Sequence, residues 1–352
     1  DWKYTLDNSK LPQNFGTGDT LNETFSLVAS DDTSVDLTVT LSGSETGAVL
    51  KGPLHQAIVY YDYDGNGQRT PGEPFVTTDE DGSYVLHADA GLEAVAIEDR
   101  VVVPEDGTFQ VIVEMTTDTV DYTSGEGFVD SGIALKAAAS EGGVVTPMTT
   151  IHEHSKEHVD DGLVDSFSAD DLRNALGLGD LDINILTVNT HDGSLNAEVA
   201  HEVEVVQQHL LTTTLMVQEA IRGACESSTL SSSISKELAH EAALDSVVKT
   251  VLAIHEKVES EAHVGIDLSL SADLQELETQ IIADLTNGSL ATTLVSQNVS
   301  VDVEVMDYVI DHASAAIVSV NAELDKLHFE DFGGIKAGAV SYLKQDVAAE
   351  IF

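Results

Sequence analysis

The chain is poor in cysteine and in aromatic residues, and each shortage argues against particular kinds of structure or binding site. A single cysteine, Cys225, among 352 residues excludes an intramolecular disulfide framework and a cysteine-rich metal site. Cys225 ends a helical pattern beside Gly223 and Ala224, which predicts a small packing residue. Aromatic residues make up 5% of the chain, with one tryptophan, and this argues against a platform of rings that stacks sugars.

Positive charge is also scarce. There are 15 Lys and Arg residues against 62 Asp and Glu residues, which gives a net charge of -47. Such a surface repels nucleic acid and anionic lipid and attracts cations, so we expect no nucleic-acid partner. The hydrophobic content of 42% indicates a folded chain and not a disordered acidic tail. No apolar run approaches the ~18 residues that a membrane-spanning helix needs, so we expect no membrane span.

Residues 62–73, DYDGNGQRTPGE, have the spacing of a calcium-binding loop. Side-chain oxygens stand at loop positions one, three and five (Asp62, Asp64 and Asn66), and a glycine stands at position six. A backbone carbonyl is available at position seven (Gln68), and Glu73 stands at position twelve. Calcium prefers six to eight oxygen ligands and needs a sharp glycine turn in such a loop. The alternative is an Asp/Asn/Gly turn that binds nothing.

The segments around this loop differ from those of an EF-hand. Residues 57–61 (AIVYY) and 74–78 (PFVTT) are rich in β-branched and aromatic residues, which predicts strands and not helices. Residues 101–103 and 109–115 are also strand-like. We therefore expect the loop to join two strands of a β-sandwich.

The first 44 residues resemble the C-terminal half of a VCBS repeat, a cadherin-like sandwich of giant bacterial surface proteins. The resemblance rests on residues 2–8 (WKYTLDN), residues 16–21 (GTGDTL) and the alternating run at 35–41 (VDLTVTL). It implies a partial β-sandwich over residues 1–44, within a segment of a larger polypeptide. A bare strand edge would then be completed by a neighbouring domain or by another subunit.

Residues 45–136 resemble the B-type repeats of bacterial surface adhesins, which are SdrD B-like and related to Cna-B sandwiches. The matching features are the loop at 62–67, the Gly-Glu-Pro at 72–74 and the TDEDGSY run at 78–84. The resemblance implies a calcium-binding β-sandwich. Its ligands would be Asp62, Asp64, Asn66, Gln68 through its carbonyl, and Glu73. Asp79 and Asp81 would either complete the shell or build the next hairpin turn.

Beyond residue 136 the apolar spacing changes from a period of two to a period of 3.6. Residues 137–145, which begin AAASEGG, have the composition of a linker. Ser168 and Asp171 fit a capping box at a helix start. Apolar stripes predict helices around residues 199–221, 244–252, 274–285, 301–324 and 336–352, packed as an α-helical bundle over residues 146–352.

The thirteen histidines are densest in residues 152–158, HEHSKEH. His154 and His158 are four residues apart, so on a helix they share a face and could bind zinc or copper with a third ligand. The alternative is a solvated polar face at a helix start. The zinc-protease pattern H-E-x-x-H fails at all four places where it begins, because Lys156, Val205, Leu244 and Glu259 replace its second histidine. We expect no enzymatic activity.

Together these patterns predict N-terminal β-domains followed by a C-terminal α-helical bundle. They favour an extracellular or cell-surface structural protein, stabilised by Ca²⁺, that associates with copies of itself or with neighbouring domains in a filament, rod or layer. The alternative function is an adhesin module that binds a glycan or a host surface.

Overall fold

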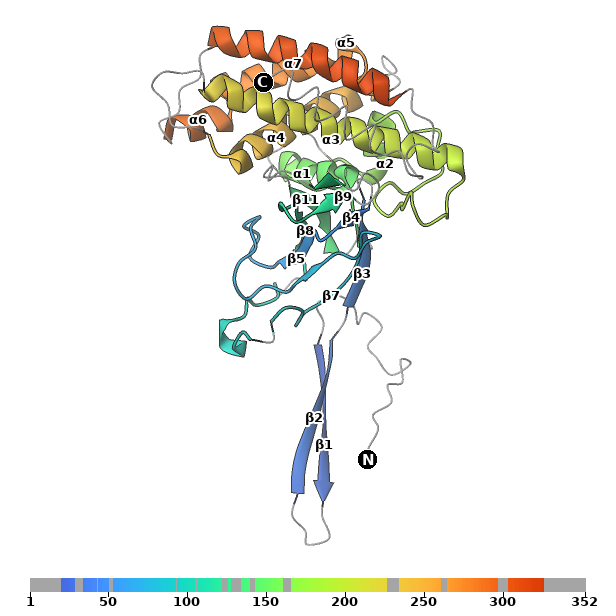
Figure 1. The fold of residues 1–352 in the computed structure, drawn as a ribbon, viewed down its shortest axis with the longest axis vertical. Helices are drawn as coiled ribbons and strands as arrows, with labels where there is room; N and C mark the ends of the chain where they lie inside the picture. The colour runs from blue at the N-terminus through green and yellow to red at the C-terminus, as the bar shows by residue number, and fades with distance from the viewer. Residues whose placement is uncertain are drawn as a thin grey trace.

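The structure is a computed structural model with an elongated shape (Figure 1). Helices lie at one end, small sheets lie in the middle, and a two-stranded hairpin projects from the sheets at the other end. The structure describes residues 20–28, 34–42, 44–50, 53–92, 94–104, 107–121, 126–127, 134–139, 143–160, 166–226, 234–260, 265–296 and 303–325.

The first half of the chain is built from short strands. The described strands are β1 (Thr20–Val28), β2 (Ser34–Ser42), β3 (Ser44–Val49), β4 (Leu54–His55), β5 (Ile58–Asp62), β6 (Phe75–Thr77), β7 (Ser83–His87), β8 (Gln110–Glu114), β9 (Val120–Asp121), β10 (Glu126–Gly127), β11 (Ala134–Ala138) and β12 (Val144–Val145). Residues 101–103, expected as a strand, have no regular structure, and Val102 is 81% exposed.

The second half is helical. The described helices are α1 (Pro147–Asp160), α2 (Ala169–Ala175), α3 (Ala197–Glu226), α4 (Lys236–Glu259), α5 (Ser271–Asn287), α6 (Ser289–Ser296) and α7 (Val303–Leu324). The predicted capping box is confirmed: the Ser168 hydroxyl accepts from the amide of Asp171, whose carboxylate accepts from the amide of Ser168. Cys225 is buried in the helical core, as predicted. The helix expected at residues 336–352 lies outside the described residues.

Two sheets share one hydrophobic core. The larger has the order β11-β8-β5-β6, with every pair antiparallel. The smaller has the order β12-β3-β7, in which β12 runs parallel to β3. Val49, Tyr61, Leu86 and Val113 all lie in the shared core. Strand β5 is buried along nearly its whole length because it pairs on both edges and its apolar residues face that core.

The expected fold class is wrong: the chain is a mixture of small sheets and helices, and it contains no cadherin-like sandwich in its described part. Strands β1 and β2 pair with each other in a hairpin, from Thr20 opposite Ser42 to Val28 opposite Ser34, and form a separate two-stranded sheet. A third small sheet, β10-β9-β4, accompanies the two that share a core. The period-two pattern predicts strands, but it does not determine which strands pair.

Sheets and helices pack directly against each other. Helix α1 lies against β11 and against α3 and α4, between the sheets and the other helices (Figure 1). Leu211 of α3 belongs to the same buried core as the sheet residues Tyr61 and Val113. The segment 137–145, expected as a linker, includes the last two residues of β11 and both residues of β12. In the described part of the chain, no helix combines the length and apolarity that crossing a bilayer requires.

Candidate metal centres

The predicted calcium loop joins β5 to β6 at one end of the larger sheet. Its first residue, Asp62, is the last residue of β5. Gly65 and Gly67 have φ angles of 69° and 73°, a conformation that glycine adopts at little cost. The hydroxyl of Tyr60 donates to the carbonyl of Gly67 over 3.1 Å. This bond holds the glycine turn of the loop against β5. The sharp turn that the sequence predicts at the sixth loop position is therefore present.

The loop brings together Asp62, Asp64 and Glu73, and one carboxylate oxygen of each lies within 4.8 Å of the others. Asp62 is 2% exposed and Glu73 is 1% exposed, whereas Asp64 is exposed. Carboxylates are almost never buried unless they are paired or bind a metal. In the described part of the chain, none of the three forms an ion pair with Lys, Arg or His.

Backbone amides hold both buried carboxylates in place. Asp62 accepts from the amide of Asn66 over 3.2 Å at Oδ1 and from the amide of Gly67 over 2.9 Å at Oδ2. Glu73 accepts from the amide of Tyr63 at Oε1 and from the amide of Thr70 at Oε2, each over 2.8 Å. A carboxylate has about four lone-pair sites, so each of these groups keeps capacity for a cation.

Asn66 and Gln68 lie on the exposed side of the loop. The Asn66 Oδ1 accepts from the amide of Gln68 over 2.7 Å, and its Nδ2 donates to the Thr70 hydroxyl over 2.8 Å. Both contacts of the Asn66 side chain are therefore made within the loop. The expected ligand at Gln68 is its backbone carbonyl, so its exposed side chain does not bear on the assignment.

The electrostatics of the loop favour a cation. Burial raises the pKa of Asp62 above its ordinary value, although amides of Gly67 and Asn66 lower it, and the neighbouring Asp64 raises it further. Burial likewise raises the pKa of Glu73, against the amides of Thr70, Tyr63 and Asp64. Both shifts show that the ionised carboxylates are poorly solvated in the folded chain. An all-oxygen donor set of this kind fits a hard divalent cation such as calcium.

Asp79 and Asp81 build the turn before β7. The amide of Asp79 donates to the Ser83 carbonyl, and the amide of Gly82 donates to the Asp79 carbonyl. The Asp81 side chain accepts from the amide of Ser83 over 3.1 Å. Neither residue belongs to the carboxylate group of the loop. Of the two roles left open by the sequence, the structure thus has both residues in a turn, although this turn connects β6 to β7 of different sheets and is not that of a hairpin.

His154 and His158 of α1 lie beside Asp245 of α4, and one donor atom of each falls within 4.8 Å of the other two. Both histidines are 6% exposed, so the expectation of a solvated polar face is wrong. Sequence reasoning missed Asp245 because it is on another helix, far along the chain. No local pattern marks it, since acidic residues are common throughout this sequence.

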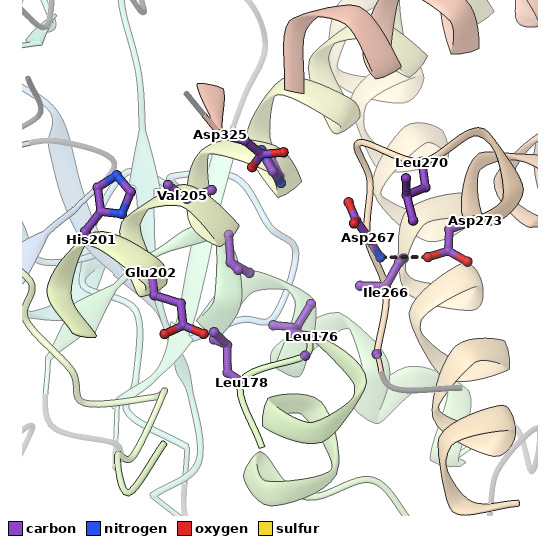
Figure 2. Close-up of a pocket in the computed structure, with 14 residues that line it drawn as sticks. Leu176, Leu178, His201, Glu202, Val205, Ile266, Asp267, Leu270, Asp273 and Asp325 are labelled. Atoms are coloured by element: carbon purple, nitrogen blue, oxygen red, sulfur yellow. Dashed lines mark hydrogen bonds and ion pairs between the residues drawn. The ribbon is translucent and has the colours of Figure 1, made fainter. Parts of the chain in front are cut away.

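A hollow of about 710 Å³ lies among α3, the turn after α2 and the segment before α5. Figure 2 shows α3, with His201, Glu202 and Val205, on one side of the hollow and the segment that carries Asp267 and Asp273 on the other. The Asp267 amide donates to the Asp273 carboxylate over 2.7 Å and holds that segment at the helix start. Among the described residues that line the hollow there is no Phe, Tyr or Trp.

Comparisons with known proteins give no family to which the chain can be assigned: no family model, no curated protein and no solved structure matches it.

Proposed function

We propose that this chain is a calcium-stabilised structural protein of the extracellular space that joins other copies of itself in a filament, rod or layer. The observation that carries the proposal is the convergence of the buried Asp62 and Glu73 with Asp64, without a basic partner in the described part of the chain. Three carboxylates in so small a volume repel one another, and a divalent cation between them removes that repulsion.

The position of the loop makes such an ion structural. Asp62 ends a strand whose Tyr60 and Tyr61 are among the largest fully buried side chains of the described residues. Tyr63, the second loop residue, packs at 4.9 Å between ring centroids against Phe109, which precedes β8. An ion that fixes the loop therefore also fixes the end of β5 against the core, and its binding energy adds to the stability of the fold.

The stability that such a site would contribute fits the calcium concentration of an extracellular medium. Sites in extracellular modules bind calcium with dissociation constants of about 10⁻⁴ to 10⁻³ M. At about 1 mM calcium, such a site contributes about 0.4 to 1.4 kcal/mol to the free energy of unfolding. The loop's resemblance to the calcium loops of surface adhesin repeats agrees with this compartment. Divalent ions would also screen a surface that carries a net charge of -47.

The projecting hairpin supports self-association. By the register of β1 and β2, Leu21 pairs with Leu41 and Val39 pairs with Glu23, so the face that carries these residues is apolar except at Glu23. Phe25 lies on the same face and is 41% exposed. Isolated two-stranded hairpins are marginally stable in water, and partners that cover the apolar face stabilise them. A second copy of the chain supplies such a partner in our proposal.

Thermal unfolding tests the calcium site. The melting temperature of the chain is measured at low ionic strength in EGTA and in millimolar calcium, for the wild type and for Glu73→Gln. We expect calcium to raise the melting temperature of the wild type by a few degrees, because a contribution of about 1 kcal/mol moves a domain of 150–250 residues by about 2 to 4 °C. The rise should be largely lost in Glu73→Gln.

The matched control is Glu80→Gln, which makes the same chemical change at an exposed glutamate in the next turn. It should keep the full response to calcium. A wild type whose melting temperature is the same in EGTA and in calcium would remove the basis of the proposal. An equal response in Glu73→Gln would assign the calcium effect to the general acidic surface and not to the loop.

A further inference from the structure

The histidine-aspartate cluster joins two helices that are distant in the sequence. His154 and His158 are one turn apart on α1, with ring centroids 5.9 Å apart. Asp245 is on α4, and its Oδ1 lies 2.9 Å from Nε2 of His158 and 3.7 Å from Nε2 of His154. The Nε2 atoms of both rings thus face the same carboxylate oxygen.

Hydrogen bonding leaves His158 poorly satisfied. Its side chain is buried, and its Nδ1 has no hydrogen-bond partner among the described residues. Its Nε2 contacts the carboxylate of Asp245 over 2.9 Å. When the imidazole is neutral with its proton on Nδ1, the lone pair of Nε2 is available to a metal ion that the same carboxylate binds.

We propose that His154, His158 and Asp245 bind a divalent transition-metal ion of the zinc class. Zinc binds imidazole nitrogen and carboxylate oxygen at about 2.0 to 2.2 Å, which separates the donors of a tetrahedral site by about 3.3 Å. The two nitrogen-oxygen separations of 2.9 Å and 3.7 Å lie on either side of that value. Small side-chain rotations would therefore bring the three donors onto one ion.

The carboxylate is already oriented for this role. Asp245 Oδ2 accepts from the Lys249 ammonium over 2.7 Å, so Oδ1 is the oxygen left for the histidines. Lys249 also donates to Oδ1 of the buried Asp284 over 2.6 Å. Outer contacts of this kind fix the direction of a metal ligand. One ammonium against two carboxylates leaves a net charge of -1 beside the cluster, which favours a cation.

The donor chemistry separates this cluster from the calcium loop. Nitrogen donors suit zinc, copper, iron and nickel, whereas calcium takes oxygen donors. Three protein ligands leave one position of a tetrahedral ion for water. The Asp245 side chain is 20% exposed, which provides access from solvent. An ion held here would clamp α1, the helix that lies on β11, to α4 of the helical layer.

Metal titration in excess calcium tests the proposal. The chain is stripped with a chelator and returned to millimolar calcium, which saturates hard carboxylate sites. It is then titrated with Co²⁺, followed by visible absorption, and with Zn²⁺, followed by calorimetry. We expect one equivalent of Co²⁺ to give the intense absorption of a tetrahedral or five-coordinate ion, and Zn²⁺ to displace it.

The variants His158→Gln and Asp245→Asn keep the size and polarity of the side chains. Loss of a residue that only contacts a metal ligand weakens metal binding by about 10- to 100-fold. Each of these variants removes a ligand itself, so we expect a larger loss of affinity. The control is His312→Ala, an exposed histidine on α7, which should bind as the wild type does. Circular dichroism and the calcium response establish that each variant is folded.

A measurement on the wild type makes the test independent of the variants. In an NMR spectrum of the imidazole nitrogens, one equivalent of Zn²⁺ should shift the Nε2 signals of His154 and His158 and leave that of His312 in place. Absence of a stoichiometric site, equal affinity in His158→Gln and the wild type, or shifts confined to other histidines would each overturn the proposal.

Discussion

The backbone amide of Tyr63 donates a 2.8 Å hydrogen bond to Oε1 of Glu73, which ties the last residue of the loop to the second. The Thr70 amide binds the other oxygen of Glu73. These bonds favour the ionised carboxylate, but burial outweighs them and raises the pKa of Glu73. Glu73 is therefore anchored in the position of a ligand while its charge remains poorly solvated.

This balance predicts how the calcium response depends on pH. The folded-state pKa values of Asp62 and Glu73 lie above the ordinary ones, so without calcium these groups favour the folded chain at low pH. That stability is lost as the pH rises through the folded-state values. Calcium competes with the protons and restores it. We expect the difference in melting temperature between calcium and EGTA to grow from pH 4.5 to pH 7.5. A difference that is constant over this range would contradict the assignment.

Glu45 gives the stability of the folded chain a second dependence on pH, which does not involve calcium. It lies in β3, is 5% exposed, and burial raises its pKa to about 7 against a contact with Tyr61 that lowers it. The folded chain favours its neutral form, so stability falls as the pH rises from the ordinary value through about 7. The pKa rises from 4.5 to about 7, and each pKa unit corresponds to about 1.36 kcal/mol. The free energy of unfolding therefore falls by on the order of 3 kcal/mol over this pH range.

The variant Glu45→Gln should therefore unfold at higher denaturant concentration than the wild type at pH 8. The advantage should disappear by pH 5, where Glu45 is neutral in the folded chain. Urea unfolding in EGTA between pH 5 and pH 8.5 measures both. Glu80→Gln, at an exposed position, should show no such pH-dependent gain. A gain for Glu45→Gln that is equal at both pH values would show that packing, and not ionisation, is responsible.

The contact between helices and sheets predicts that they unfold together. Leu211 of α3 is 3% exposed and lies in the core of the sheets. Leu211→Ala should cost about 2 to 5 kcal/mol, because it leaves a cavity between the two parts. Leu270→Ala, at a residue that is 52% exposed, is the control and should cost far less. Differential scanning calorimetry of the wild type should show one transition. Two transitions, with Leu211→Ala lowering one of them, would show that the parts unfold separately.

The hairpin predicts where copies of the chain meet. Phe25→Asp places a charge on its apolar face, so it should reduce self-association without lowering the calcium-dependent rise in melting temperature. Light scattering after size-exclusion chromatography, over a range of protein concentrations in millimolar calcium, measures the mass. Val102→Asp is the matched control, because Val102 is 81% exposed outside any strand. Equal masses for both variants and the wild type would exclude the hairpin as the interface.

Features that depend on residues close together in the chain could be predicted from residue order. The spacing of Asp62, Asp64, Asn66 and Glu73 predicted a tight loop, and its glycines take the positive φ angles that the turn needs. Strand-like composition and apolar periodicity located β2, β5, β6 and β8 and the helices α3, α4, α5 and α7, and Ser168 with Asp171 marked the start of α2. These outcomes follow from backbone geometry and hydrogen bonds over a few residues, which local residue order controls.

Which helices and strands contact one another became visible in the three-dimensional fold and not in the residue order. Nothing near His158 indicates Asp245, and nothing in β12 indicates that it pairs in parallel with β3. The expected sandwich failed for the same reason: the alternation in β1 and β2 is that of half-buried strands, yet they form a separate hairpin. Pairing and burial depend on contacts between residues far apart in the chain, and an apolar stripe specifies that a face is to be covered without specifying what covers it.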